Sequence, residues 1–199
     1  MRKQVLTVDP AELSRLANQL LETMMEDGFR PDCVVGIATG GAIVATAMQL
    51  PDNIQAHTVQ LRRPSTATKD SSPFARKLAN FLPYFVLDHL RRVEDRRLEH
   101  RAARDRPTST RFNLELDKVA QTVLASARSR IAVVDDAVDS GTTLAMVAEG
   151  LRSRLDSSVE IRTAVLTVTR PDDRIALVPN HRLFDQTLLR FPWSMDYKG

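Results

Sequence analysis

Apolar residues recur along most of the chain at spacings that distinguish helices from buried strands. In the first such segment they follow helical spacing from Leu13 to Met24. Asp9 and Pro10 precede this segment as a capping residue and a first-turn proline, and Gly28 follows it as a stop signal. The segment therefore predicts an amphipathic helix that buries one face.

Short apolar runs and helical patterns alternate through much of the remaining chain. The runs predict strands, at Asp32–Ile37, Ala56–Leu61, Ile131–Asp135, Ile161–Thr169 and Arg174–Val178. Helical spacing predicts helices at Ala42–Leu50 and Thr142–Arg154. Alternating strands and helices indicate an α/β fold, in which helices cover both faces of a doubly wound, mostly parallel sheet.

One stretch, Ser65–Asp117, interrupts this alternation. It begins polar, becomes apolar and helical over Leu78–Leu90, and is then densely charged over Arg91–Arg106. The apolar part predicts core or dimer packing, and the charged part mixes both signs, which is typical of a solvated helix face. We expect a single domain over residues 1–199, in which residues 65–117 supply a lid and a helical insertion.

Composition narrows the class of protein. The chain has 199 residues, 43% hydrophobic and 27% charged, as in a globular domain with its own core. Cys33 is the only cysteine, which favours a reducing, cytoplasmic setting. No apolar run reaches the length of about 18 residues that a membrane span needs, so we expect no membrane partner. A net charge of +3 suits an anionic small substrate as well as nucleic acid and decides neither.

The segment with the most specific chemistry is Ile131–Leu144, IAVVDDAVDSGTTL. An apolar strand ends in Asp135 and Asp136, and Ser-Gly-Thr-Thr then opens a helix. Helix N-termini carry unpaired N–H groups that favour phosphate, and a glycine lets the backbone approach an anion closely. Two acids beside a phosphate site suit ribose hydroxyls or a bound Mg²⁺. A simple helix cap with solvated acids is the alternative, but the full pattern favours a ribose 5-phosphate site.

A second glycine-bearing loop, Thr39–Gly41, follows the first core strand and opens the next helix. By itself such a glycine pair indicates no more than a tight turn. In open parallel sheets, however, ligands bind beyond the carboxyl ends of the strands, and both glycine loops fall at such ends. We therefore expect the two loops to form one site.

The segment VVDDAVDSGTTL resembles the phosphoribosyl-pyrophosphate (PRPP) signature of the type I phosphoribosyltransferases, nearest in pattern to the 6-oxopurine and xanthine-type enzymes. Val35–Ala42 resembles the pyrophosphate loop of the same family. The resemblance implies a five-stranded doubly wound core and a C-terminal hood over the base site, here residues 170–199. It also implies a homodimer that transfers phosphoribose from PRPP to a nitrogenous base, foremost a purine, with Mg²⁺ as cofactor and release of pyrophosphate.

The resemblance also implies roles for individual residues. Asp135 and Asp136 would hold the ribose hydroxyls, and with PRPP the Mg²⁺, while Asp139 would manage a proton of the base as general acid/base. The implied phosphate ligands are Ser140, Gly141, Thr142 and Thr143 for the 5-phosphate, and Thr39, Gly40 and Gly41 for the pyrophosphate. The implied cations of the lid are Arg62, Arg63 and Lys69.

The chain departs from the family pattern mainly where the base would bind. Thr39 stands where many relatives have Arg or Lys, and Thr169 stands near the place of a lysine that reads the base O6. The base-side candidates are Arg170 as a substitute for that lysine, Leu188 at the position of the stacking aromatic, and Trp193, for which plain hood packing is the alternative. The identity of the base is therefore open.

Two classes of function follow. Asp139 and the complete acid pair favour a phosphoribosyltransferase. Thr39 and Thr169 favour a regulator that senses PRPP or a nucleotide on the same fold, with nucleic acid a further partner through Arg91–Arg106. A P-loop kinase is poorly supported because the chain has no G-x-x-x-x-G-K-[ST] motif.

Overall fold

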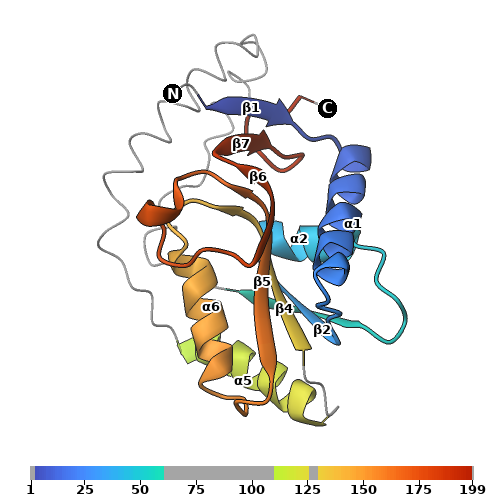
Figure 1. The fold of residues 1–199 in the computed structure, drawn as a ribbon, viewed down its shortest axis with the longest axis vertical. Helices are drawn as coiled ribbons and strands as arrows, with labels where there is room; N and C mark the ends of the chain where they lie inside the picture. The colour runs from blue at the N-terminus through green and yellow to red at the C-terminus, as the bar shows by residue number, and fades with distance from the viewer. Residues whose placement is uncertain (1–2, 61–109, 126–129, 199) are drawn as a thin grey trace.

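The computed structural model describes residues 3–60, 110–125 and 130–198. Its main element is a five-stranded sheet in the order β3-β2-β4-β5-β6, in which all neighbouring strands are parallel (Figure 1). The strands are β2 (Cys33–Ala38), β3 (Gln55–Gln60), β4 (Arg130–Val138), β5 (Glu160–Val168) and β6 (His181–Asp185). The predicted α/β class with a mostly parallel sheet is confirmed.

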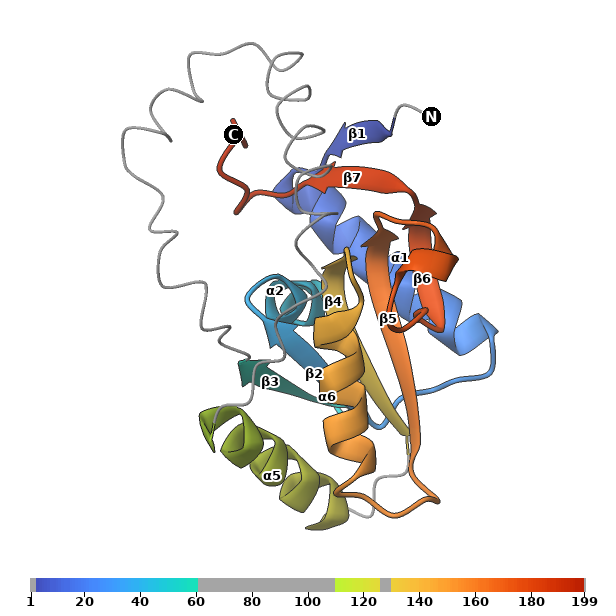
Figure 2. The ribbon, with the colours of Figure 1, turned by 90° about the vertical axis from the view of Figure 1, so that its left-hand side faces the viewer.

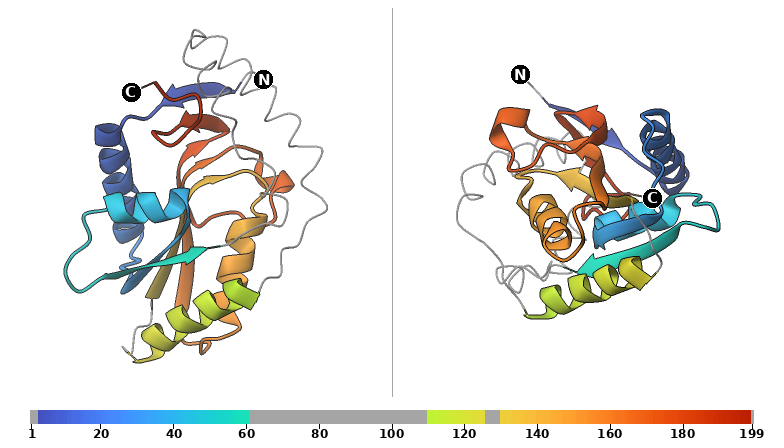
Figure 3. Two further views of the ribbon diagram at one scale, coloured as in Figure 1. Left: turned by 180° about the vertical axis from the view of Figure 1, so that it is seen from behind. Right: turned by 60° about the horizontal axis from the view of Figure 1, so that its bottom comes forward.

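Helices cover both faces of this sheet, as the doubly wound prediction requires. One face carries α1 (Pro10–Glu26) and α2 (Gly40–Ala47), and the other carries α5 (Thr110–Ala125) and α6 (Thr142–Arg152). Figure 2 and both views of Figure 3 show α5 and α6 together on the side of the sheet away from α1.

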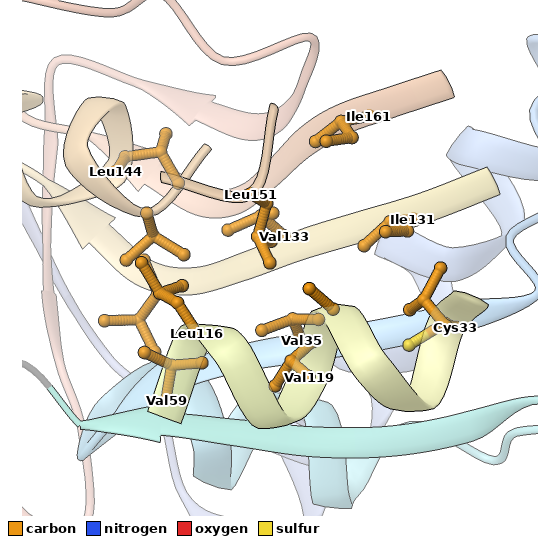
Figure 4. Packing of buried hydrophobic residues seen from close by; sticks show 14 of the residues in the cluster. Cys33, Val35, Val59, Leu116, Val119, Ile131, Val133, Leu144, Leu151 and Ile161 are labelled. Carbon is orange, nitrogen blue, oxygen red and sulfur yellow. The ribbon is translucent and has the colours of Figure 1, made fainter. Parts of the chain in front are cut away.

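Alternation along the buried strands explains the two layers. Val34 and Val134 belong to the apolar cluster under α1 and α2, whereas Val35 and Val133 belong to the cluster under α5 and α6. Figure 4 shows Val35 and Val133 close to Leu116 of α5. Strands buried on both faces read as continuous apolar runs, which is why the sequence revealed them.

The first helix forms where its capping signals predict. The Asp9 carboxylate accepts a hydrogen bond from the Glu12 N–H at 2.8 Å, and Pro10 is the first helical residue. Gly28 adopts a left-handed φ of +76°, and the Phe29 N–H donates to the Met24 carbonyl at 3.0 Å. The predicted start and stop of α1 are confirmed.

A second, two-stranded parallel sheet, called here the small sheet, joins β1 (Gln4–Thr7) to β7 (Thr187–Arg190). The two strands lie side by side at the top of Figure 1, beyond β6. Arg190 is 2% exposed and links this sheet to its surroundings, since Nη1 donates to Thr7 Oγ1 and Nε to Asp196 Oδ2, both at 2.8 Å. Neither strand was predicted from the sequence.

Two predicted elements require correction. The strand expected at Arg174–Val178 is wrong, because a short 3₁₀ turn, η2 (Asp172–Arg174), and a loop occupy this region and the edge strand is β6. Ile175 and Leu177 alternate as in a strand, but they pack on the cluster under α6, and the Ala176 N–H donates to the Ser140 carbonyl at 2.8 Å.

The second correction concerns the expected insertion 65–117. Residues 110–117 form the first half of α5, a helix of the core layer in which Leu116 is fully buried. Leu78–Leu90 and Arg91–Arg106 lie outside the described residues. Within the described ranges, no helix combines the length and the apolar content that a membrane crossing requires.

Candidate functional site

The two glycine loops meet at the carboxyl end of the sheet. β2 and β4 are adjacent and in register, with Gly36 opposite Val134, so the loop after β2 lies beside the acids that end β4. A Cβ on Gly40 would overlap the Asp136 carboxylate, and a Cβ on Gly41 would lie 2.7 Å from Asp135 Cα. Glycine is therefore required because the start of α2 touches the acid pair directly.

Both acids are half-buried and partly engaged within the protein. The Asp136 N–H donates to Asp135 Oδ1, and the Ala137 N–H donates to Asp136 Oδ1, each at 3.0 Å. Trp193 Nε1–H donates to Asp136 Oδ2 at 3.3 Å. Burial raises the pKa of Asp136, and hydrogen bonds from Asp135, Trp193 and Ala137 oppose that rise. The acids are thus held by short backbone contacts at fixed positions.

The segment Ser140–Thr143, called here the phosphate loop after its predicted role, leads into α6, where the sequence predicts a helix start. Gly141 is the N-cap of α6 with a left-handed φ of +70°, and the Ser140 hydroxyl donates to Thr142 Oγ1 at 3.1 Å. A small hollow lies at this helix start, lined by Asp135, Ala137, Val138, Asp139, Ser140, Gly141, Thr143 and Leu144. Helix amides and hydroxyls around a hollow beside carboxylates suit a sugar phosphate.

A loop of the chain also borders this helix start. A Cβ on Gly141 would lie 2.9 Å from the Leu177 nitrogen and 3.1 Å from the Ala176 nitrogen. The segment that was expected to be a strand at Arg174–Val178 therefore forms one wall of the phosphate loop. In the sequence, only the alternation of Ile175 and Leu177 hinted at this contact.

Asp139 lies in a network that the sequence analysis missed. Arg170 Nε is 2.7 Å from Asp139 Oδ1, Arg170 Nη2 donates to Oδ2 at 2.9 Å, and the Thr169 hydroxyl donates to Oδ1 at 3.1 Å. The Arg170 side chain is 7% exposed and that of Asp139 39%. The guanidinium is paired with the carboxylate, so a ligand that binds Asp139 must share or displace this contact.

Strand register was the signal that could have revealed this pair. β4 and β5 are parallel, with Val138 opposite Val168, so the residues that follow, Asp139 and Thr169, emerge side by side. The two departures from the family pattern at Thr169 and Arg170 therefore converge on one carboxylate.

The base-side candidates occupy three separate places. Arg170 pairs with Asp139, and Trp193 contacts Asp136 while stacking on Phe191, with ring centroids 4.7 Å apart and planes 4° apart. Leu188 lies in β7, paired with Val5 and 6% exposed. The lid candidates Arg62, Arg63 and Lys69 lie outside the described residues.

The donor set at this edge fits a divalent cation that arrives with its ligand. Among residues 3–60, 110–125 and 130–198 no group of three or more His, Cys, Asp or Glu side chains could hold a metal ion. Mg²⁺ usually keeps several waters and binds through one or two carboxylates together with substrate phosphates. Asp135 and Asp136 provide such a pair beside the phosphate loop.

Comparison with known proteins gives likeness in structure only. No protein-family model matches the chain, and no curated protein matches its sequence. A solved purine phosphoribosyltransferase from Pyrococcus horikoshii is 19% identical, with a TM-score of 0.54, over 97% of this chain and 94% of that one. The xanthine-guanine-hypoxanthine phosphoribosyltransferase of Helicobacter pylori is 13% identical, with a TM-score of 0.53, over 96% and 93%.

A third similar structure is a hypothetical protein from Neisseria gonorrhoeae with bound ppGpp. It is 17% identical, with a TM-score of 0.59, over 97% of this chain and 90% of that one. These matches cover almost the whole of each chain. The chain therefore has the phosphoribosyltransferase fold that its PRPP-like motif implied.

Proposed function

We propose that this protein transfers the phosphoribosyl group of PRPP to a nitrogenous base, most of all a purine, and releases pyrophosphate. The observation that carries the proposal is that the glycines of Thr39–Gly41 lie against Asp135 and Asp136, while the hollow at the phosphate loop is lined by Asp135. Two of the similar structures are purine and xanthine-guanine-hypoxanthine phosphoribosyltransferases, which supports a purine acceptor.

In this proposal, separate groups of the chain bind the ribose, the 5-phosphate and the pyrophosphate. Asp135 and Asp136 accept hydrogen bonds from the ribose hydroxyls, and the start of α6 binds the 5-phosphate. The start of α2, at Thr39–Gly41, directs helix N–H groups toward the leaving pyrophosphate and stabilises its charge. Mg²⁺ bound with PRPP supplies further charge neutralisation on that leaving group.

Asp139 is the group that handles the base in this proposal. Its carboxylate accepts a base N–H, and Arg170 orients it through two contacts. Proton removal from the base then requires Asp139 to loosen its pairing with Arg170. The same guanidinium is the donor that this proposal assigns to an exocyclic oxygen of the base.

A second candidate function is a regulator that binds a purine nucleotide without turning it over. Two observations favour it: Thr39 brings no positive charge to the pyrophosphate loop, and Arg170 occupies Asp139. The Neisseria gonorrhoeae protein of the same fold was solved with bound ppGpp, a nucleotide that, like PRPP, contains a ribose phosphorylated at its 5-position. The ribose-phosphate half of the site would serve both functions.

The deciding experiment incubates the purified protein with PRPP, Mg²⁺ and a panel of bases, and follows pyrophosphate release. Turnover with a purine supports the transferase, whereas tight PRPP binding without turnover on any base supports the regulator. Asp135→Asn with Asp136→Asn should weaken PRPP binding by about a hundredfold or more, since two charge-assisted hydrogen bonds are lost. Unchanged PRPP affinity in that double variant would refute the site, with the exposed Asp173→Asn as the matched control.

A further inference from the structure

Trp193, the only tryptophan of the chain, approaches the acid pair from the C-terminal segment. Its indole Nε1–H donates to Asp136 Oδ2 at 3.3 Å across 57 residues of sequence. The other oxygen, Oδ1, accepts the Ala137 N–H at 3.0 Å. The two donors hold the carboxylate from two sides, and a carboxylate offers about four acceptor sites in all.

The indole is itself held by a rigid turn over residues 191–194. The Phe191 N–H donates to Ser194 Oγ at 3.0 Å, and the Ser194 N–H donates to the Phe191 carbonyl at 2.9 Å. Phe191 is 3% exposed within the cluster under α1, and its ring stacks on Trp193. The turn therefore holds the indole in the position from which it donates to Asp136.

The opposite side of the Asp136 carboxylate is closed as well. The start of α2 lies against it so tightly that a Cβ on Gly40 would overlap the carboxylate. The backbone of β4 and Trp193 hold it from other directions. The position of this side chain thus depends on the small sheet, through the turn that follows β7.

We propose that Trp193 is a positioning residue for Asp136, which fixes the carboxylate for a sugar diol through the indole N–H. The inference rests on the proposed function, because it takes Asp136 to bind ribose hydroxyls. It makes the C-terminal turn part of sugar recognition rather than a cover for the base alone. Loss of the N–H, with the ring retained, should weaken binding of a ribose diol by about tenfold, the value of one hydrogen bond to a charged group.

The test uses two variants of Trp193. In the first, an isosteric analogue carries sulfur in place of the ring N–H, and it replaces Trp193 alone because the chain has one tryptophan. The second is Trp193→Phe. Ribose 5-phosphate and 2,3-dideoxyribose 5-phosphate are the probes, measured by calorimetry on the full chain. Thermal unfolding shows that each variant is folded. The expected result is a tenfold weaker affinity for ribose 5-phosphate in both variants, with unchanged affinity for the dideoxy compound.

Each other outcome counts against the inference in a distinct way. Equal weakening for both probes would show that Trp193 supports the site as a whole, and unchanged affinity for both would show that its N–H positions nothing. If the unaltered protein binds neither ribose 5-phosphate nor PRPP, the proposed function itself fails. Binding by the unaltered protein with no effect of the sulfur analogue would overturn only the role of Trp193.

Discussion

The two halves of the candidate site are built by different means. The sugar-phosphate half uses small residues, backbone amides and short polar side chains at the ends of the adjacent strands β2 and β4. The proposed base half uses long side chains from the segment after β5 and from the C-terminal segment. These side chains already contact other residues, since Arg170 pairs with Asp139 and Trp193 reaches across to Asp136 of the sugar-phosphate half. A sugar phosphate is recognised by close approach of backbone, whereas a base is recognised by side chains that must first be released or oriented.

The largest expected effects come from the glycines of the sugar-phosphate half. In Gly41→Ala the new Cβ would lie 2.7 Å from Asp135 Cα and meet the Val134 carbonyl, both backbone groups that cannot rotate away. We expect a loss of about 3 kcal/mol of unfolding free energy, as for severe overpacking. In Gly40→Ala the clash falls on the Asp136 carboxylate, so we expect about a hundredfold loss of PRPP affinity and a smaller loss of stability.

Thermal unfolding and calorimetry separate these two outcomes. Gly150→Ala in α6 is the matched control, since its new Cβ would meet the end of the Leu116 side chain, which can shift. If Gly40→Ala and Gly41→Ala lost the same stability and the same PRPP affinity, the two glycines would not have separate roles in placing the carboxylate and in folding. That result would weaken the contrast between the two halves.

An intermediate effect is expected from the pair that dominates the base half. Arg170→Met should cost about 1–2 kcal/mol of unfolding free energy, because Asp139 is left without its cation but is 39% exposed and regains some water. Turnover with a base should fall by about a hundredfold because Asp139 is no longer oriented. PRPP affinity should change little, because Arg170 lies outside the acid pair and the Ser140–Thr143 loop.

Steady-state kinetics with PRPP and base varied separately provide the measurement. Thr169→Val, which removes only the third donor to Asp139, serves as the milder companion variant. A drop in PRPP affinity equal to the drop in turnover would mean that the two halves act as one unit.

The smallest expected effect is a pH dependence that starts at the amino end of the edge strand β6, away from the site. His181 opens β6, is 5% exposed, stacks on Phe29 and lies 4.0 Å from Asp27 Oδ2. Burial lowers the pKa of His181 below its usual 6.5, while Asp27 opposes this and Arg162 adds to it. Below pH 6.5 the unfolded chain therefore binds more protons at His181 than the folded chain does. The free energy of unfolding is unaffected by His181 above that pH and decreases as the pH falls toward the folded pKa.

Hydrogen-exchange protection at about pH 7.5 and about pH 5.5 tests this expectation, because that range spans an ordinary histidine titration. Amides of β6 should lose more protection than those of β4. His181→Gln should remove the difference between the two strands. Equal loss of protection in β4 and β6 would show that acid loosens the whole sheet rather than its edge at β6.

The sequence predicted the central sheet well, for a physical reason. β2, β4 and β5 are buried on both faces, so their apolar runs stand out. Gly141 was expected to let the backbone approach an anion, and its left-handed φ was not predicted. The reason for Gly40 differed from the expected one. A glycine is required at position 40 because a Cβ there would overlap the Asp136 carboxylate, whether or not an anion is bound.

The base half escaped prediction because its contacts join residues far apart in sequence. Arg170 reaches Asp139 across 31 positions and Trp193 reaches Asp136 across 57, and no local spacing encodes either contact. β1 and β7 are four residues long each and pair across the full length of the chain, so their short patterns resembled loops. The opposite error occurred at Ile175 and Leu177. They alternate as in a strand, but they belong to a loop that packs on the core.

The pairing of β1 with β7 sets an order of assembly during protein synthesis. The bond between Thr7 and Arg190 closes a separation of 183 residues, so β1 leaves the ribosome long before its partner exists. Closing so long a loop in an unfolded chain costs about 5 kcal/mol of entropy, whereas a formed central sheet shortens the span to be closed. A nascent chain that ends after β6 thus already carries both glycine loops and the acid pair, and it must wait for its last residues before Trp193 can reach Asp136.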